Sequence, residues 1–232
     1  MSADLRGGYQ DDAVVEPLRK PLTSDPLLDL KTTRIEALSD GVFAIAMTIL
    51  VLNITVPTAA TVPADRLIAA LRNTAPQVIV YIVTFINLGV LWVGHHNQYH
   101  FIARADRWFL WLNILYLLLI SFMPLSTALL GHYPLNRVAL FVYGVNLIAA
   151  TLVLAAHWQY ATTTGRLARD TLAPAVVRLA HRRILGSVGA YTVALLLSLV
   201  VPVVAFALFL AVPLLNVFPF TLDRYFRASS KE

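Results

Sequence analysis

The amino-acid sequence predicts an all-α membrane protein with six transmembrane helices. Three observations support this: 58% of the 232 residues are hydrophobic, only 13% are charged, and the hydrophobic residues fall in long runs. A soluble domain carries about 25% charged residues. The mean hydropathy of +0.70 therefore indicates apolar surface that lipid has to cover.

The two ends of the chain differ from its middle. Residues 1–30 are polar and contain proline, and they hold no apolar run that could serve as a signal peptide. We expect a mobile N-terminal tail at 1–30, a transmembrane domain at 31–223 and a short C-terminal tail at 224–232.

The first apolar run, ALSDGVFAIAMTILVLNITV at residues 37–56, has 20 residues. At about 1.5 Å per residue this is enough to cross roughly 30 Å of hydrocarbon. A proline-containing loop follows. The next three spans are expected at residues 76–97, 107–131 and 134–158, with Pro134 in the first turn of the last.

The C-terminal part holds a basic connector at 159–183 and then 39 residues, 184–222, without a charge. As one helix this stretch would be about 58 Å long, nearly twice the thickness of the hydrocarbon core. It therefore predicts two spans, joined near Val201–Pro202.

The basic residues test the number of spans. With six spans and both termini in the cytoplasm, 15 of the 18 Lys and Arg residues lie on the inner side, as the positive-inside rule requires. The net charge of +5 is then explained by contact with a lipid bilayer, and no nucleic-acid partner is expected.

One face of the first span is a stripe of apolar side chains. On a helical wheel Ile45, Ile49 and Leu52 lie within about 60° of one another, with Thr48 at the edge. Two explanations fit this pattern: ordinary helix packing, or the lining of a pore, because apolar constrictions can gate by dewetting.

Polar residues of three spans are predicted at a similar depth, near the cytoplasmic side. Hydrogen bonds among them would satisfy groups that lipid cannot. Such a cluster locks helices together or senses protons; a metal site is disfavoured, because adjacent histidines on a helix diverge by about 100°. The residues are Ser39, Asp40, Trp92, His95, His96 and Asn113. The other histidines near span ends, including His157, are expected at the membrane interface.

No motif of an enzyme is present. The sequence lacks a glycine-rich phosphate loop, a metalloprotease motif and a Ser-His-Asp arrangement, and it has no cysteine for thiol chemistry. The TVGYG filter of ordinary potassium channels is also absent. We expect a protein that is not an enzyme and has no cofactor.

The run from Arg34 to Ala46, RIEALSDGVFAIA, closely resembles the first-helix signature of the endosomal/lysosomal potassium channel family, of the transmembrane-protein-175 type, and its bacterial homologues. That signature is an Arg, three residues, then Phe-Ser-Asp; here Leu38 replaces the Phe. The resemblance continues in LWVGHH at 91–96, in Asn113 and in Pro124.

The resemblance implies a homotetramer in which the first helix of each subunit lines a central pore for potassium ions. The positions that match the pore lining are Ile45, Thr48, Ile49 and Leu52, with hydrophobic layers as the constriction and a threonine layer for potassium preference. The positions that match a structural polar network are Arg34, Ser39, Asp40, Trp92, His95 and Asn113, with His96 adjacent.

Two functions are therefore weighed. The first is a potassium-permeable cation channel in the plasma membrane of a prokaryotic cell. The alternative is a proton-coupled secondary transporter, with Asp40 and His95 in a proton relay. No convincing internal repeat of the kind common in transporters is found, which favours the channel.

Overall fold

The computed structural model describes residues 32–163, 167–168 and 172–217. The expected tails at 1–30 and 224–232 lie outside these ranges. The described residues form helices joined by short connections, with one isolated β-bridge between Ile102 and Ala168. The helices are α1 (Thr32–Ile49), the 3₁₀ turns η1 (Leu50–Asn53) and η2 (Ala64–Arg66), α2 (Leu67–Asn73), α3 (Ala75–Phe101), α4 (Arg107–His132), α5 (Arg137–Thr163), α6 (Pro174–Ser198) and α7 (Pro202–Val217).

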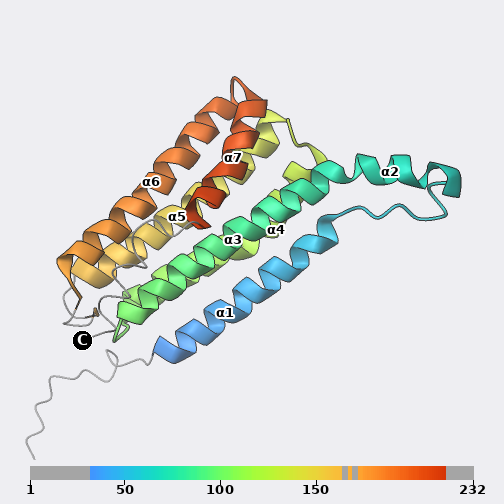
Figure 1. Cartoon of the computed structure of the whole chain (residues 1–232). Helices are drawn as coiled ribbons and strands as arrows, with labels where there is room; N and C mark the ends of the chain where they lie inside the picture. The colour runs from blue at the N-terminus through green and yellow to red at the C-terminus, as the bar shows by residue number, and fades with distance from the viewer. Residues whose placement is uncertain (1–31, 164–166, 169–171, 218–232) are drawn as a thin grey trace, which may run out of the picture.

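The long helices run side by side along one direction (Figure 1). We call the end of this bundle where α1 begins and α3 ends the proximal end, and the opposite end the distal end. The hairpin of α6 and α7 packs on α5 and α3 at one side. At the other side α1 packs on α3 and α4, so α1 lies at the edge of the subunit opposite the hairpin.

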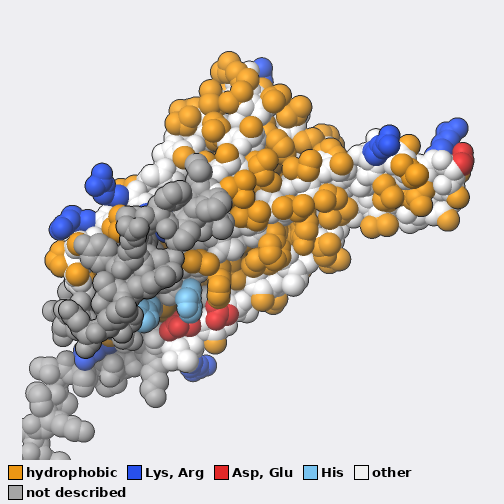
Figure 2. Space-filling view, in the orientation of Figure 1, with side chains coloured by type: hydrophobic (Ala, Val, Ile, Leu, Met, Phe, Trp, Pro, Cys, Tyr) orange, Lys and Arg blue, Asp and Glu red, His pale blue; other side chains and the backbone are white. Residues whose placement is uncertain are grey.

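Among the described residues, four helical segments are long and apolar enough to cross a membrane: Thr32–Asn53, which joins α1 and η1, and helices α3, α4 and α5. Apolar side chains cover the middle of the molecule in Figure 2, whereas Lys and Arg side chains gather toward its two ends. This distribution matches a bilayer, in which hydrocarbon contacts the middle and water contacts both ends. The chain is an all-helical membrane protein.

The last two helices have the form of a hairpin. Helix α6 begins with a basic stretch that holds Arg178, Arg182 and Arg183, and the apolar part of α7 is the short segment Pro202–Leu214. The turn between them lies at residues 199–201, next to the predicted join, because Pro202 has no amide hydrogen with which to continue α6.

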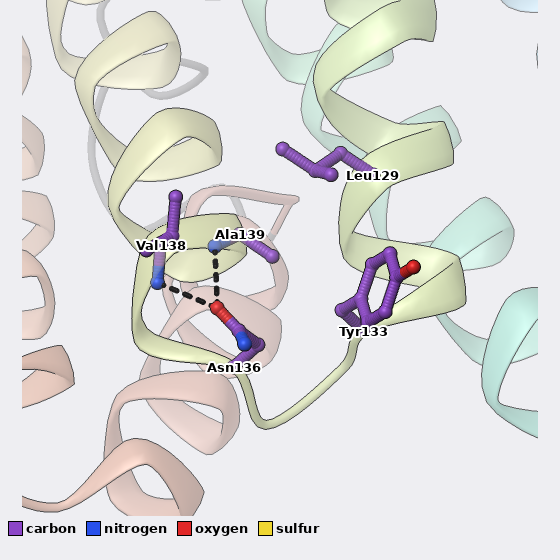
Figure 3. Close-up of a pocket in the computed structure, with 5 residues that line it drawn as sticks. All are labelled: Leu129, Tyr133, Asn136, Val138 and Ala139. Carbon is purple, nitrogen blue, oxygen red and sulfur yellow. Dashed lines mark hydrogen bonds between the residues drawn. The ribbon is translucent and has the colours of Figure 1, made fainter.

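The start of α5 differs from the prediction, which placed Pro134 in its first turn. Helix α5 begins at Arg137. The side-chain oxygen of Asn136 accepts hydrogen bonds from the amides of Val138 (2.9 Å) and Ala139 (3.4 Å) (Figure 3). An N-terminal cap of this kind satisfies amides that have no partner inside the helix, so the helix starts after Asn136 and not at Pro134.

The connection between α1 and α3 was expected to be a loop, but it contains η2 and α2. We call residues 54–73 the distal arm. No residue of α2 is buried, and in Figure 1 the arm projects beyond the distal end of the bundle. Sequence reasoning missed this helix because the segment is too short for a clear periodicity.

Candidate functional site

Helix α1 has one buried face and one exposed face. The buried residues Ile35, Ser39, Phe43 and Ala46 recur at spacings of three and four, and Leu50 continues the row into η1. Such a row lies on one side of a helix. It packs on α3 and α4, which fixes the rotation of α1 about its own axis.

The opposite side of α1 carries the apolar stripe identified in the sequence. The exposed fractions are 59% for Ile45, 41% for Ile49 and 77% for Leu52, and Thr48 is exposed as well. These four side chains therefore lie on the surface formed by the described residues, and none of them belongs to the buried core.

The threonine of the stripe bonds to its own helix. Its hydroxyl group lies 2.8 Å from the carbonyl oxygen of Ala44 and 3.0 Å from that of Ile45. Because the hydroxyl hydrogen is used inward, the lone pairs of Oγ1 remain available on the exposed side. Thr48 thus presents an oxygen atom between apolar side chains.

The α-helical geometry ends just after this point. Helix α1 stops at Ile49, and Leu52 lies on the tighter 3₁₀ turn η1. The Nδ2 atom of Asn53 donates a 2.8 Å hydrogen bond to the carbonyl oxygen of Pro124 in α4. This bond ties the distal end of the stripe to the rest of the subunit.

Three of the predicted polar residues form a buried cluster at the proximal end. His95 Nε2 donates to Asn113 Oδ1 (2.9 Å), and Asn113 Nδ2 donates to Ser39 Oγ (3.3 Å). Ser39 in turn donates to the carbonyl oxygen of Ile35 (2.8 Å). All three side chains are buried, so the cluster joins α1, α3 and α4 where neither water nor lipid can replace a lost bond.

A second pair lies at the surface beside the buried cluster. Trp92 Nε1 donates a 2.8 Å hydrogen bond to Asp40 Oδ1, and the ring of His96 stacks on that of Trp92 at a centroid distance of 5.4 Å. Arg34 is exposed on the first turn of α1 and forms no hydrogen bond with these residues. The predicted network therefore divides into a buried group and an exposed group, with Arg34 apart from both.

His157 was expected at the membrane interface, and this expectation is wrong for its side chain, which is 1% exposed. Its Nδ1 atom donates to Gln98 Oε1 (2.9 Å), and its ring lies 3.9 Å from that of Phe109 and 5.8 Å from that of His95, measured between centroids. The signal in the sequence was Gln98, which follows His95 by three residues and so lies on the same face of α3.

Sequence reasoning also missed a second buried polar group halfway along the bundle. Tyr191 donates to Asn87 Oδ1 (2.6 Å), and Asn87 Nδ2 donates to the hydroxyl oxygen of Tyr143 (3.3 Å). Thr84 donates to the same oxygen (3.2 Å), and Thr127 donates to Thr84 (3.2 Å). These five residues, which we call the central polar group, connect α3, α4, α5 and α6.

Within the described ranges no three His, Asp or Glu side chains come together in a way that could hold a metal ion. The chemistry that the site offers is of a different kind. It consists of an exposed apolar stripe with one hydroxyl oxygen, held in place by hydrogen bonds on the far side of the same helix.

Comparison with known proteins agrees with these features. The family model described as endosomal/lysosomal potassium channel TMEM175 matches residues 34–124. A potassium channel of Chamaesiphon minutus is 41% identical over 140 residues, which cover 59% of this chain and 69% of that protein. A potassium channel of Streptomyces collinus is 39% identical over 161 residues, covering 67% of this chain and 77% of that protein.

A solved structure extends the similarity to the fold. The crystal structure of a lysosomal potassium-selective channel TMEM175 homolog from Chamaesiphon minutus superimposes with a TM-score of 0.72 at 33% identity, over 80% of this chain and 96% of that one. These two bacterial relatives are similar over most of their own lengths, and the solved structure shares the helical arrangement. The chain belongs to the TMEM175 family of ion channels.

Proposed function

We propose that four copies of this chain form a potassium-permeable cation channel, with α1 of each copy lining a central pore. The observation that carries this proposal is the exposed stripe of Ile45, Thr48, Ile49 and Leu52. The names of the bacterial relatives, which are potassium channels, support it. So does the position of α1 at the edge of the subunit, where its exposed face is available to line an axis shared with other copies.

The stripe suggests how ions would pass. Rings of Ile45, Ile49 and Leu52 side chains would form apolar constrictions that conduct only when they are wet. Thr48 would add a ring of hydroxyl oxygens between them, the polar layer at which a potassium ion exchanges water for protein ligands. Because such a pore offers few fixed ligands, its discrimination against sodium should be weaker than that of a carbonyl-lined filter.

The buried cluster of Ser39, His95 and Asn113 and the Asp40–Trp92 pair would serve as anchors of α1. They act on the side of the helix opposite the stripe. Their contribution to conduction is then indirect, since they fix the rotation that turns the stripe toward the axis. Arg34, which forms no hydrogen bond with these residues, would not be one of the anchors.

The proposed topology has six spans, with α6 and α7 as the fifth and sixth and both termini in the cytoplasm. The basic stretch that begins α6 supports an inner location for that end. The bacterial sources of the relatives support a prokaryotic plasma membrane as the site of action. The family membership favours the channel over the proton-coupled transporter built on Asp40 and His95.

The pore is tested by changing its constriction. Ile45→Asn and Leu52→Asn should each raise potassium flux into liposomes, by about tenfold for every ~1.4 kcal/mol removed from the barrier, because an amide side chain keeps the constriction wet. The matched controls are Ile82→Asn on α3 and Leu118→Asn on α4, which are 48% and 62% exposed but lie away from the stripe. Equal flux in all four variants would rule out this pore.

Reversal potentials test the ion. Purified protein is placed in a planar bilayer with potassium on one side and sodium on the other. It should give unitary currents, and the sign of their reversal potential should be the one expected for a channel that prefers potassium. Turnover at the rate of a carrier, without unitary currents, would instead support the transporter.

A further inference from the structure

The distal arm carries apolar side chains that its own subunit does not cover. Leu67, Ile68 and Leu71 of α2 are 42%, 70% and 50% exposed. Their spacing places them on one side of the helix. Within its own chain α2 packs on its sequence neighbours η2 and α3 and buries no residue.

Charged residues lie next to the apolar side chains of α2. The arm projects past the distal end of the bundle (Figure 1), and it is flanked by Asp65, Arg66 and Arg72, whose charges are costly in hydrocarbon. A contiguous exposed apolar surface marks a protein or a membrane contact. The charges that flank the apolar side chains of the arm favour a protein surface over hydrocarbon as its contact.

A pocket of suitable chemistry lies at that same end. It is formed where α4 turns into α5, and it is lined by Leu129, Tyr133, Asn136, Val138 and Ala139 (Figure 3). It is open to the surface and has a volume of about 230 Å³; an enclosed apolar cavity of roughly 150 Å³ accommodates a benzene ring. One or two branched aliphatic side chains fit such a space.

We propose that the arm of one subunit inserts Ile68 and Leu71 into the α4–α5 pocket of a neighbouring copy of the same chain. This inference rests on the proposed function, which brings several copies around one axis. Arm and pocket are different surfaces of one chain, so the contact is head-to-tail, the kind that closes into a ring.

The course of the chain supports a second copy as the occupant. The arm starts where the exposed stripe ends, and Val56, 72% exposed, continues the apolar surface from Leu52 toward α2. A copy that covers the stripe is thus adjacent to the arm. The arm is also braced at its root, since the Thr55 amide donates to Gln77 Oε1 at 2.7 Å.

The chain has no cysteine, which makes cross-linking a clean test. The double variant Ile68→Cys/Val138→Cys, purified in mild detergent, should form chain-to-chain links on oxidation or with a short bismaleimide, giving a ladder of dimers and higher species on a denaturing gel. The matched control, Ala69→Cys/Val138→Cys, places the thiol on the opposite side of α2 and should stay largely monomeric.

The possible outcomes separate this proposal from the pore. If the Ile68→Cys/Val138→Cys protein gives no chain-to-chain links, or no more than the control, while its potassium flux is normal, the arm contact is wrong and the pore stands. If links form efficiently but Ile45→Asn and Leu52→Asn leave flux unchanged, the arm contact stands and the pore is wrong.

Discussion

The α1–η1 segment and helix α5 are both long and apolar enough to cross a membrane, but they differ in how much of each the subunit covers. Of the most apolar stretch of each, 28% of the residues are buried in the α1–η1 segment and 56% in α5. Helix α5 is surrounded by α4, α6 and α7, whereas α1 contacts α3 and α4. In a membrane protein, apolar composition shows that a helix crosses the bilayer, and coverage shows whether it belongs to the core or to a surface shared with other chains.

The covered helix is also the more closely packed one. A Cβ atom at Gly144 of α5 would lie 2.7 Å from Cζ of Phe209 and 2.9 Å from Cδ1 of Leu195. At Gly41 of α1, by contrast, an added Cβ atom would meet nothing within 4 Å. Small residues at helix contacts let backbones approach closely in lipid, so Gly144 has a packing role in the subunit that Gly41 lacks.

The largest expected effect comes from opening the core at α5. Trp158 is among the largest fully buried side chains, and Trp158→Ala should destabilise the subunit by about 3–5 kcal/mol, seen as a lower thermal unfolding temperature in detergent. Trp111→Ala on α4 is the control, because Trp111 is 59% exposed. Similar losses in both variants would contradict the difference in coverage.

A smaller effect is expected where α1 is anchored. Asn113→Leu leaves the ring nitrogen of His95 without its partner, which should cost about 1–3 kcal/mol and loosen α1 from α3 and α4. Unfolding temperature and potassium flux should both change. A variant that keeps wild-type values of both would show that the buried cluster does not hold α1.

The smallest effect is expected at the exposed pair. Trp92→Phe removes the donor to Asp40 and should cost about 0.5–1.5 kcal/mol, since water can hydrate the exposed carboxylate. Asp40→Asn retains an acceptor oxygen and should cost less. If Trp92→Phe lowers the unfolding temperature as much as Asn113→Leu, the exposed Asp40–Trp92 pair and the buried cluster do not differ in their contribution to stability.

Much of the architecture followed from the order of residues along the chain. Runs of apolar residues marked the spans, and Pro202 marked the turn after α6. Depth alone, counted from the ends of antiparallel spans, placed Ser39, His95 and Asn113 at one level, and the structure brings these side chains into contact.

Other features could not be reached in this way, because nearly every side chain of a span is apolar and periodicity does not identify the covered face. The burial of His157 depends on how α5 is rotated against Phe109 and Gln98. The central polar group depends on four helices meeting at Tyr143 and Asn87. Such contacts depend on tertiary packing, and the sequence of a single span does not predict them.

The central polar group has a mechanical consequence. Its bonds lie in the dry interior, where no solvent competes for the freed donors and acceptors, so sliding α3, α4, α5 and α6 past one another would break several of them at once. These four helices therefore act as a stiff frame. In the proposed channel, motion that opens or closes the conduit would be confined to α1 and η1. This segment is joined to the frame by side-chain bonds at Ser39, at the adjacent Asp40 and at Asn53. Between the last two of these bonds, apolar packing of Phe43, Ala46 and Leu50 holds it.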